Sequence, residues 1–409
     1  MKYGLFKYET ENIGDEIQSI AARRFLPTVD ELIDRDRLGE YAPSEEIKLI
    51  TNGWFMHAPY QWPPKSEMVK PLLISMYVDS SDPKVGDAFF SDEGIEYLNS
   101  HGPVGARDLS TLELLRKHGV DAYFSGCMTL TLQRDPDIPK GDFILAVDVP
   151  QPVVDMIRQH TDRAVIQSSP YFDANMSQTD RFQLAEYFLY LYQSAHAVIS
   201  TRLHAMLPSL AMGTPVFLVK DHQKYDEKRY AGLADLVNSA TDTEYLEDYS
   251  LFDVDNPKAN PDTFLEIRER LISTVSKFTG YNNSSTFRTV DFSKIARNES
   301  YIRLFTKGFY SLNRALLLEG DKSWLQEQND DLHRINDDLR KINDDLRMVH
   351  ENQNAHIEEL ESIRKNLVTQ NEELRKQIEE IKNSNTWKIG SIATAPGRRI
   401  KDLIKEGKK

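Results

Sequence analysis

The sequence predicts an α/β protein with two Rossmann-like domains, followed by an α-helical coiled coil at the C-terminus. Two observations favour the α/β class: short apolar runs alternate with segments of helical periodicity, and this alternation occurs twice over stretches of similar size. The coiled coil is indicated by an abrupt change of composition after Trp324, where charged heptads begin. At roughly 150 residues per domain, 409 residues fit two globular domains and an additional segment.

These patterns divide the chain into five parts. We expect a first Rossmann-like domain over residues 1–135 and a second one over 136–282. A helical connector over 283–321, the coiled coil over 322–382 and a basic amphipathic tail over 383–409 follow. Ligands of open parallel sheets bind beyond the carboxyl ends of the strands. We therefore expect one site where the two domains face one another.

In the first domain, short apolar runs have the character of strands buried in a parallel sheet. The predicted strands are Lys2–Phe6, Ile47–Thr51, Leu72–Tyr77 and Val120–Phe124. Two segments have apolar residues at helical spacing, Asp15–Phe25 and Leu109–His118. The second of these predicted helices ends before Gly119, a residue suited to a helix C-terminus.

The second domain repeats the alternation. Its predicted strands are Ile144–Val149, Arg163–Gln167, Ala197–Ser200 and Pro215–Val219. Its predicted helices are Pro152–His160, Arg181–Ala195 and Leu203–Met212. The proline of the first helix stands near its first turn, where a missing N–H costs nothing.

The predicted coiled coil rests on apolar residues that alternate in steps of three and four from 332 to 349. The later apolar residues Leu360, Ile363, Leu367 and Leu374 keep this phase. The polar residues Gln353, His356 and Gln370 interrupt it. Sustained heptads predict a homo-oligomer, and a single solvated helix is the alternative.

The tail over 383–409 has a net charge of +5 in a chain of net charge -14. A basic amphipathic segment that includes Trp387 suits an anionic membrane surface. A solvated chain end and docking onto a partner protein are the alternatives.

Composition excludes several classes of function. The net charge of -14 argues against a nucleic-acid partner. The single cysteine, Cys127, excludes a disulfide within the chain. No metal-ligand spacing or glycine-rich nucleotide fingerprint occurs, so we predict no metal site. The start of the chain lacks an apolar signal segment, and no window approaches the roughly 18 apolar residues of a membrane span. We expect a cytoplasmic protein.

Two candidate segments combine glycine with polar residues. Asn12, Gly14 and Asp15 open a predicted helix, where free backbone N–H groups attract an anion; Asp15 as a simple N-cap is the alternative. Gly53 lies in an Asn-Gly-Trp segment after a predicted strand. For this segment a packed turn is the favoured interpretation.

Two further segments place arginines after predicted strands. Arg107, with Ser110 entering the next helix, could clamp a carboxylate or phosphate, although an ordinary Arg107–Asp108 surface pair would give the same pattern. Arg202, Leu203 and His204 begin another helix. His204 could exchange protons near neutral pH or simply cap or pack. Three cations follow downstream, Lys224, Lys228 and Arg229. They could add positive charge to the same cleft or simply be solvated.

Together, three segments resemble the polysaccharide pyruvyl transferase family: "NIGDEIQSIAARRFL" (12–26), "GARDLSTLELLRKHG" (105–119) and "VISTRLHAMLPSLAMGTPVFLV" (198–219). The last is the most specific, and the resemblance covers roughly residues 1–280. It implies transfer of pyruvate from phosphoenolpyruvate to a sugar diol of a glycan or lipid-linked oligosaccharide, giving a cyclic ketal without a metal or cofactor. It also implies a GT-B-like fold of two Rossmann-like domains with the site between them.

The resemblance assigns roles to individual residues. It implies His204 as the acid and base, with Arg107 and Arg202 also in the catalytic set. For donor binding it implies Arg107, Arg202, Leu203 and Lys228 or Arg229, with Lys224 as an alternative cation. Their placement at strand ends or helix starts adds Asn12, Gly14, Asp15, Gly53 and Ser110 to the expected donor-binding set. The chain departs from the family pattern at Asn52-Gly53-Trp54 and Ser125-Gly126-Cys127.

Two other functions remain open at this point. The first is a nucleotide-sugar-dependent glycosyltransferase of the same architecture. The second is a non-catalytic coiled-coil scaffold for glycan assembly. For the preferred function, membrane contact of the tail would place the protein at the inner face of the membrane, where lipid-linked glycans are assembled.

Overall fold

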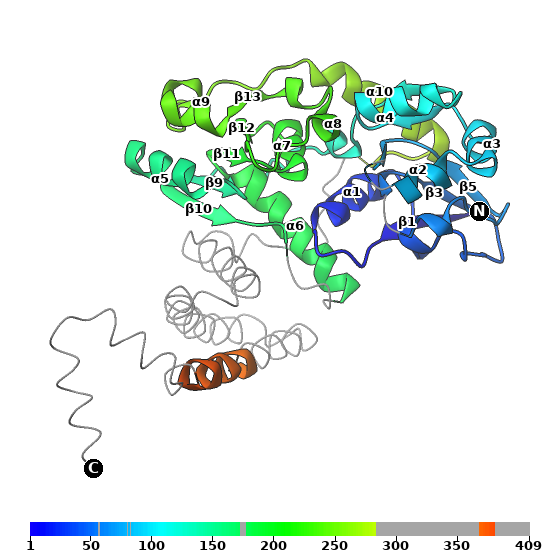
Figure 1. Cartoon of the computed structure of the whole chain (residues 1–409), viewed down its shortest axis with the longest axis horizontal. Coiled ribbons are helices and arrows are strands. Elements are labelled where there is room, and N and C mark those ends of the chain that lie inside the picture. Colours follow the sequence, from blue (N-terminus) through cyan, green and yellow to red (C-terminus); the bar gives the residue numbers. More distant parts are fainter. Residues whose placement is uncertain (56–57, 80, 82, 172–176, 284–367, 381–409) are drawn as a thin grey trace, which may run out of the picture. The chain divides into compact units, whose positions relative to one another are not determined.

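The computed structural model describes residues 1–283, apart from 56–57, 80, 82 and 172–176, together with residues 368–380 (Figure 1). The chain divides into two compact units, Met1–Thr306 and Lys307–Lys409. In the second unit the described residues, 368–380, are helical. The rest of the predicted coiled coil, the basic tail and the predicted connector beyond residue 283 lie outside the described residues.

The first half of the first unit contains two four-stranded parallel sheets. In spatial order, the strands of one are β2 (Glu31–Asp34), β1 (Lys2–Lys7), β3 (Ile47–Ile50) and β5 (Val69–Leu72). Those of the other are β4 (Gly53–Phe55), β6 (Met76–Val78), β7 (Val104–Ala106) and β8 (Ala122–Phe124). Short apolar strands buried in parallel sheets are what the sequence predicted for this region.

The segments that contain β3 and β5 continue from the first sheet into the second. β3 pairs with β5, and a few residues later β4 pairs with β6 in the same direction. Between them, Thr51 N donates to Leu72 O at 2.9 Å and Gly53 N to Ser75 O at 3.4 Å. The single predicted strand Leu72–Tyr77 is therefore divided, because Ser75 has a φ of 53° and bonds through its hydroxyl to Gly126 O at 2.7 Å.

The second half contains a five-stranded parallel sheet. Its strands, in spatial order, are β10 (Ala164–Ser168), β9 (Phe143–Val147), β11 (Ala197–Ser200), β12 (Val216–Lys220) and β13 (Asn238–Thr241). The strand order reverses between β9 and β11, and ligands of open parallel sheets bind at the carboxyl ends of strands at such a point. The predicted strands of this half agree with β9 to β12 within a residue or two.

The helices that the structure describes in the first unit connect and cover these strands. They are α1 (Gly14–Arg23), α2 (Pro83–Phe89), α3 (Asp92–Ser100), α4 (Leu109–Lys117), α5 (Gln151–His160), α6 (Gln178–Ser194), α7 (Leu203–Ala211), α8 (Glu227–Tyr230), α9 (Asp242–Glu247) and α10 (Phe264–Thr279). Each half has a hydrophobic cluster of its own among the described residues, with members between Phe6 and Ala122 and between Ile144 and Val254. The predicted boundary near residue 135 falls between these clusters, and the five-part division itself stays a prediction.

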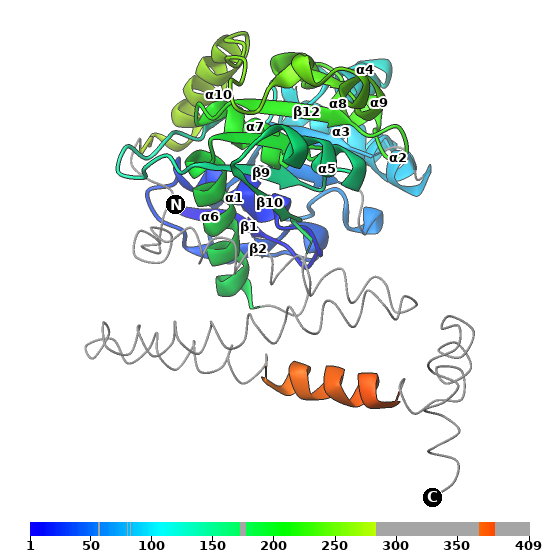
Figure 2. The same cartoon turned by 90° about the vertical axis from the view of Figure 1, so that its left-hand side faces the viewer.

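Charged contacts and α10 tie the two halves together. α1 packs against α6 and α7 near the middle of the unit (Figure 1). At this contact, Arg181 Nε lies 2.5 Å from Glu16 Oε1. α10, at the edge of the unit in Figure 2, returns to the first half, where Lys48 Nζ donates to Phe278 O at 2.6 Å. Among the described residues, no helix is long and apolar enough to cross a membrane.

Candidate functional site

Arg107 follows β7 directly, and its backbone N–H donates to Met76 O at 2.8 Å. The side chain is completely buried. Its Cζ lies 4.1 Å from the centre of the Tyr77 ring, and its Nε lies 3.4 Å from Asp108 Oδ2. None of its three guanidinium nitrogens has a hydrogen-bond partner among the described residues. A buried cation with open donors is costly unless an anion completes it.

Asp108 is the neighbouring carboxylate, but it has a structural task of its own. It caps α4, because its Oδ1 accepts from Thr111 N at 2.8 Å. Ser110 is half-buried in the first turn of the same helix. Asp108 therefore offsets part of the charge of Arg107 without using its hydrogen-bond donors.

His204 lies in the first turn of α7, and only 7% of it is exposed. A Cβ on Gly14 would lie 2.8 Å from His204 Nδ1, so the start of α1 approaches the imidazole at a distance that only glycine allows. On the other side of the ring, Nε2 lies 3.8 Å from Cys127 Sγ. Burial lowers the pKa of His204 well below 6.5, and the charges of Arg107 and Arg229 lower it further. The imidazole is therefore neutral at pH 7.

Arg229, in α8, supplies a second cation to this region. Its Cζ lies 4.7 Å from the centre of the Trp54 ring, and the Trp54 and Tyr77 ring centres are 6.3 Å apart. Arg107, Tyr77, Trp54 and Arg229 thus form one series of contacts, which we call the arginine–aromatic stack. Arg229 Nε, like the nitrogens of Arg107, is buried without a hydrogen-bond partner in the described part of the chain. Two such cations at one site favour a ligand with more than one negative charge.

Arg202 lies at the switch point between β9 and β11, where the sheet geometry predicts a ligand. Its Nε is ion-paired with the carboxylate of Asp148, a residue just after β9 with a φ of 53°. Its Nη1 lies 3.2 Å from Tyr171 Oη. Although burial lowers it, the pKa of Arg202 is raised overall by Asp148. Unlike the nitrogens of Arg107, Nε and Nη1 of this arginine already have hydrogen-bond partners within the protein.

The structure places the remaining predicted donor-binding residues in varied settings. Asn12 Oδ1 accepts from Gly14 N at 2.9 Å and so shapes the start of α1. Asp15 is buried and lies 3.6 Å from Arg35 Nη1 through its Oδ2, while Ile13 occupies the N-cap position. Gly53 begins β4 with a φ of 150°, so the expected packed turn is instead the start of a strand.

The other members of the predicted set differ mainly in exposure. Leu203 is buried as the first residue of α7. Of the three downstream cations, Lys224 and Lys228 are exposed, whereas Arg229 is half-buried in the arginine–aromatic stack. Because the three stand close in sequence, only the fold distinguishes them.

Sequence reasoning missed the aromatic members of the site. Tyr77 stood within a predicted strand and Trp54 within a predicted turn, and neither position carries a signal for stacking on arginine. Cys127 was recognised only as a lone cysteine, whereas the fold places it beside His204. Burial raises the pKa of its thiol, so the cysteine remains protonated at neutral pH.

Among the residues that the structure describes, one group has the composition of a metal site: Asp221, His222 and Asp242, whose ligand atoms lie within 4.8 Å of one another. Hydrogen bonds account for this proximity. His222 Nδ1 lies 2.6 Å from Asp242 Oδ2, and Asp221 Oδ1 accepts from Gln223 N at 2.9 Å. The group therefore gives no reason to propose a metal.

Comparisons with known proteins give a family for the central part of the chain. No curated protein matches. Among solved structures, a chain from the co-structure of S. aureus MnaA with UDP is similar, with 12% identity and a TM-score of 0.36 over 68% of this chain and 97% of that one. The family model of polysaccharide pyruvyl transferase matches residues 83–222, which include Arg107, Arg202 and His204. Residues 83–222 thus match the polysaccharide pyruvyl transferase family, which confirms the resemblance for the segments 105–119 and 198–219, while the segment 12–26 lies outside the match.

Proposed function

We propose that this protein is a transferase that moves pyruvate from phosphoenolpyruvate onto a sugar diol of a cell-surface polysaccharide or its precursor, forming a cyclic ketal. The observation that carries the proposal is the buried guanidinium of Arg107, whose nitrogens have no hydrogen-bond partner in the described part of the chain. Phosphoenolpyruvate carries a carboxylate and a phosphate, and arginine binds both groups through paired hydrogen bonds. The family match over residues 83–222 supports the same function.

In this proposal Arg107 and Arg229 bind the anionic groups of the donor from the two ends of the arginine–aromatic stack. Arg202 has a different task. Its Nε is held by Asp148, so it contributes the donors that this ion pair leaves available, at the switch point of the second sheet. The start of α1, where Gly14 meets His204, closes this region on one side.

His204 is proposed to move the protons. It is neutral in the free protein because burial and two arginines lower its pKa. A bound donor offsets the charge of these arginines, so the pKa of His204 rises and the ring can take up a proton. It then protonates the methylene carbon of phosphoenolpyruvate, and the central carbon becomes electron-deficient.

The first sugar hydroxyl adds to that carbon and gives its proton to the now neutral His204. Phosphate then leaves with the electrons of its C–O bond, and the second hydroxyl adds and releases its proton to phosphate or solvent. The balance is phosphoenolpyruvate plus diol giving ketal plus inorganic phosphate. No oxidant, reductant or metal is needed for this sequence.

The proposal is tested by incubating the full-length protein with phosphoenolpyruvate and a panel of synthetic and lipid-linked glycans. Phosphate release should depend on both substrates. Mass spectrometry should show the acceptor gaining a pyruvate ketal with loss of water. Turnover of nucleotide sugars without consumption of phosphoenolpyruvate would instead favour the glycosyltransferase alternative.

We further propose that the two halves of the first unit form a GT-B-like pair and that residues 322–382 assemble the protein into a homo-oligomer. The motivation for the second point is the heptad pattern, because apart from 368–380 these residues lie outside the described part of the chain. Light scattering should give a multiple of the chain mass for the full-length protein and a lower multiple for a chain ending near residue 321. Equal multiples would contradict this role.

The tail over 383–409 is proposed to bind anionic membranes from the cytoplasmic side, on the basis of its net charge of +5 and its apolar residues. Several tails in one oligomer would add weak contacts together. Co-sedimentation with anionic vesicles should be lost at high salt and on deletion of 383–409. Equal binding to neutral vesicles would exclude the electrostatic part of this proposal.

A further inference from the structure

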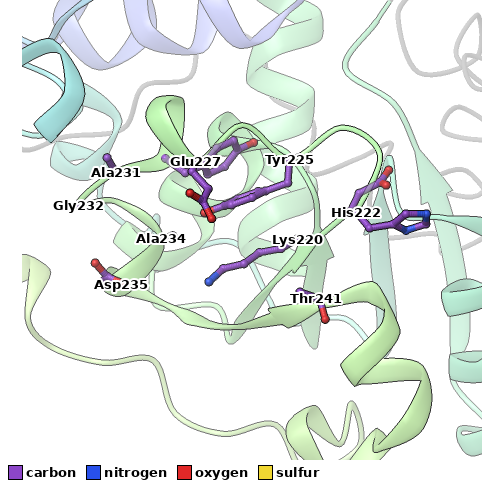
Figure 3. Close-up of a pocket in the computed structure, with 11 residues that line it drawn as sticks. Lys220, His222, Tyr225, Glu227, Ala231, Gly232, Ala234, Asp235 and Thr241 are labelled. Atoms are coloured by element: carbon purple, nitrogen blue, oxygen red, sulfur yellow. The ribbon is translucent and has the colours of Figure 1, made fainter.

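A cavity of about 440 Å³ opens beside α8, at the carboxyl ends of β12 and β13. Its wall combines aromatic rings with hydrogen-bonding groups, chiefly from Lys220, Tyr225, Glu227, Tyr230, Asp235 and Thr241. In Figure 3, the side chains of Tyr225, Glu227 and Lys220 converge on the same space, while His222 points away from it. We call this cavity the α8 pocket.

The polar groups of the α8 pocket are largely free to bind a ligand. Within the described residues, Lys220 Nζ and the carboxylates of Glu227 and Asp235 take part in no hydrogen bond or ion pair. The amine of Lys220 lies 5.7 Å from the centre of the Tyr225 ring. Burial raises the pKa of Tyr225 to about 12, and the charges of Glu227 and Asp235 contribute, so its hydroxyl stays protonated and can donate. The pocket therefore offers both donors and acceptors.

The two tyrosines provide apolar surface next to these groups. The ring centres of Tyr225 and Tyr230 are 4.9 Å apart, with an angle of 37° between the ring planes. Aromatic faces beside a few placed hydrogen-bonding groups suit a ring that is apolar on its faces and polar at its edge, which describes a sugar.

The charge of the pocket distinguishes it from the arginine–aromatic stack. Glu227 and Asp235 bring two carboxylates against the one amine of Lys220. Such a surface repels phosphate and carboxylate groups, and carboxylates are good acceptors for sugar hydroxyls. The stack has two arginines with open donors and suits an anion. The two regions are thus selective for ligands of different charge.

α8 is a shared wall between these regions. Arg229 belongs to the stack, and the next residue, Tyr230, lines the pocket. Tyr230 Oη donates to Thr201 O at 2.7 Å, immediately before Arg202. On the other side, Leu109 N donates to Ala231 O at 3.0 Å, two residues after Arg107. A ligand in the α8 pocket would therefore lie next to the residues proposed to hold the donor.

We propose that the α8 pocket binds a neutral sugar unit of the acceptor glycan. The inference rests on the proposed function, because it assigns the second substrate of that reaction to a place in the fold. It separates the two substrates by charge: the anionic donor on the arginines and the neutral acceptor among carboxylates and tyrosines.

The first experiment measures binding alone. Full-length protein is applied to an array of neutral hexose and N-acetylhexosamine oligosaccharides, with UDP-sugars titrated separately. The wild type should bind a subset of the oligosaccharides, and Tyr225→Ala and Glu227→Gln should each weaken that binding roughly 10-fold or more, as expected for loss of a stacking face or a charged hydrogen bond. Glu247→Gln, an exposed glutamate on α9 outside the pocket, is the matched control and should bind as the wild type does.

Binding of UDP-sugars in preference to the oligosaccharides would overturn the proposal. So would oligosaccharide binding that is absent in the wild type or equal in the Tyr225→Ala variant. Circular dichroism and the melting temperature of each variant show whether a loss of binding reflects unfolding. Glu227→Gln removes only a charge at an exposed position, so at least this variant should retain the fold.

A second experiment separates this inference from the proposed function. With phosphoenolpyruvate and the best-bound glycan, Tyr225→Ala and Glu227→Gln should raise the KM for the glycan roughly 10-fold while the KM for phosphoenolpyruvate changes less than about twofold. Arg107→Lys should show the opposite pattern. Absence of phosphoenolpyruvate turnover with intact, pocket-dependent glycan binding would refute the transferase proposal alone. Equal effects of the pocket variants on both KM values would refute the pocket assignment alone.

Discussion

The guanidinium carbon of Arg107 lies 4.1 Å from the centre of the Tyr77 ring, so the cation is stabilised by a contact that uses none of its N–H donors. Arg107 is otherwise completely buried, its Nε lies 3.4 Å from Asp108 Oδ2, and none of its nitrogens is hydrogen-bonded among the described residues. Its five N–H donors therefore remain available to a planar or tetrahedral anion. This arrangement gives two predictions, one for function and one for stability.

Arg107→Lys should lower kcat/KM for phosphoenolpyruvate by about 10–100-fold, because lysine keeps the charge but loses the paired geometry of the guanidinium. Steady-state kinetics with phosphoenolpyruvate as the varied substrate measures the effect. Arg37→Lys, at an exposed position outside the site, serves as the control and should leave kcat/KM unchanged. Equal kcat/KM in Arg107→Lys and the wild type would show that paired hydrogen bonds at this position play no part in donor binding.

Arg107→Met, combined with Asp108→Asn so that no buried carboxylate loses its ion-pair partner, should abolish turnover and yet raise the melting temperature of the ligand-free protein. The reason is that the wild-type side chain buries a charge without hydrogen bonds, a cost that an apolar side chain of similar length does not carry. Phosphoenolpyruvate should raise the melting temperature of the wild type and leave that of the double variant unchanged. A lower melting temperature in the variant would mean that Arg107 stabilises the empty site.

His204→Gln should reduce kcat by about 10²–10⁴-fold, the usual contribution of a general acid or base, while much of the donor affinity remains. Glutamine approximates the size of the imidazole, so it should keep the packing of this position against Gly14. Binding is measured as the thermal shift with phosphoenolpyruvate and turnover as phosphate release. Turnover near that of the wild type would remove His204 from the mechanism.

The charge state of His204 should depend on the donor. In the free protein its pKa lies well below 6.5, so the ring should remain neutral as the pH falls through the usual range of histidine. Phosphoenolpyruvate, as an anion beside Arg107 and Arg229, should raise this pKa. Arg229→Gln should raise it in the free protein as well, because one of the charges that lower it is removed. An NMR titration of the histidine rings, assigned with His204→Gln, measures each value, and an unchanged pKa on adding phosphoenolpyruvate would contradict the proposed role.

Much of the strand order along the chain could be predicted because buried parallel strands are short apolar runs. The run Ala197–Ser200, for example, is β11 with the predicted bounds. The division of Leu72–Tyr77 could not be predicted, because it depends on a bond between Ser75 and Gly126, which are far apart in sequence. β13 was missed because its residues, Asn238–Thr241, lack an apolar run.

At the site, local sequence was sufficient for residues whose role depends on position at a strand or helix end. Arg107 after β7 and His204 at the start of α7 are of this kind. Contacts between residues far apart in the chain could not be predicted from the sequence. Gly14 was expected to approach an anion, and the fold brings it against His204. Likewise, only the packing of α8 against Trp54 distinguishes Arg229 from Lys228.

A final prediction concerns the buried ion pair between α1 and α6, where Arg181 Nε lies 2.5 Å from Glu16 Oε1. Burial raises the pKa of Glu16 from 4.5 to about 7, even though Arg181 lowers it. Because the folded-state pKa lies above the unfolded one, the folded protein binds the proton more readily. The contribution of Glu16 to stability is therefore greatest below about pH 4.5, and it decreases as the pH rises to about 7.

Arg181→Met removes the partner of this carboxylate and should raise the pKa of Glu16 further. At pH 8 the folded protein must then either bury an unpaired charge or take up a proton, which should lower the free energy of unfolding by about 3–5 kcal/mol. At pH 5 the carboxyl is already protonated in the folded state, so the loss should be smaller. Denaturant unfolding followed by tryptophan fluorescence at both pH values measures the difference.

Two control variants test the role of the charge. The stability of the double variant Glu16→Gln/Arg181→Met should have little pH dependence from this site. Arg158→Met, which breaks an exposed pair with Asp155, should lower the free energy of unfolding by at most about 1 kcal/mol at either pH. Equal destabilisation by Arg181→Met at pH 5 and pH 8 would show that its effect arises from lost packing and not from the charge of Glu16.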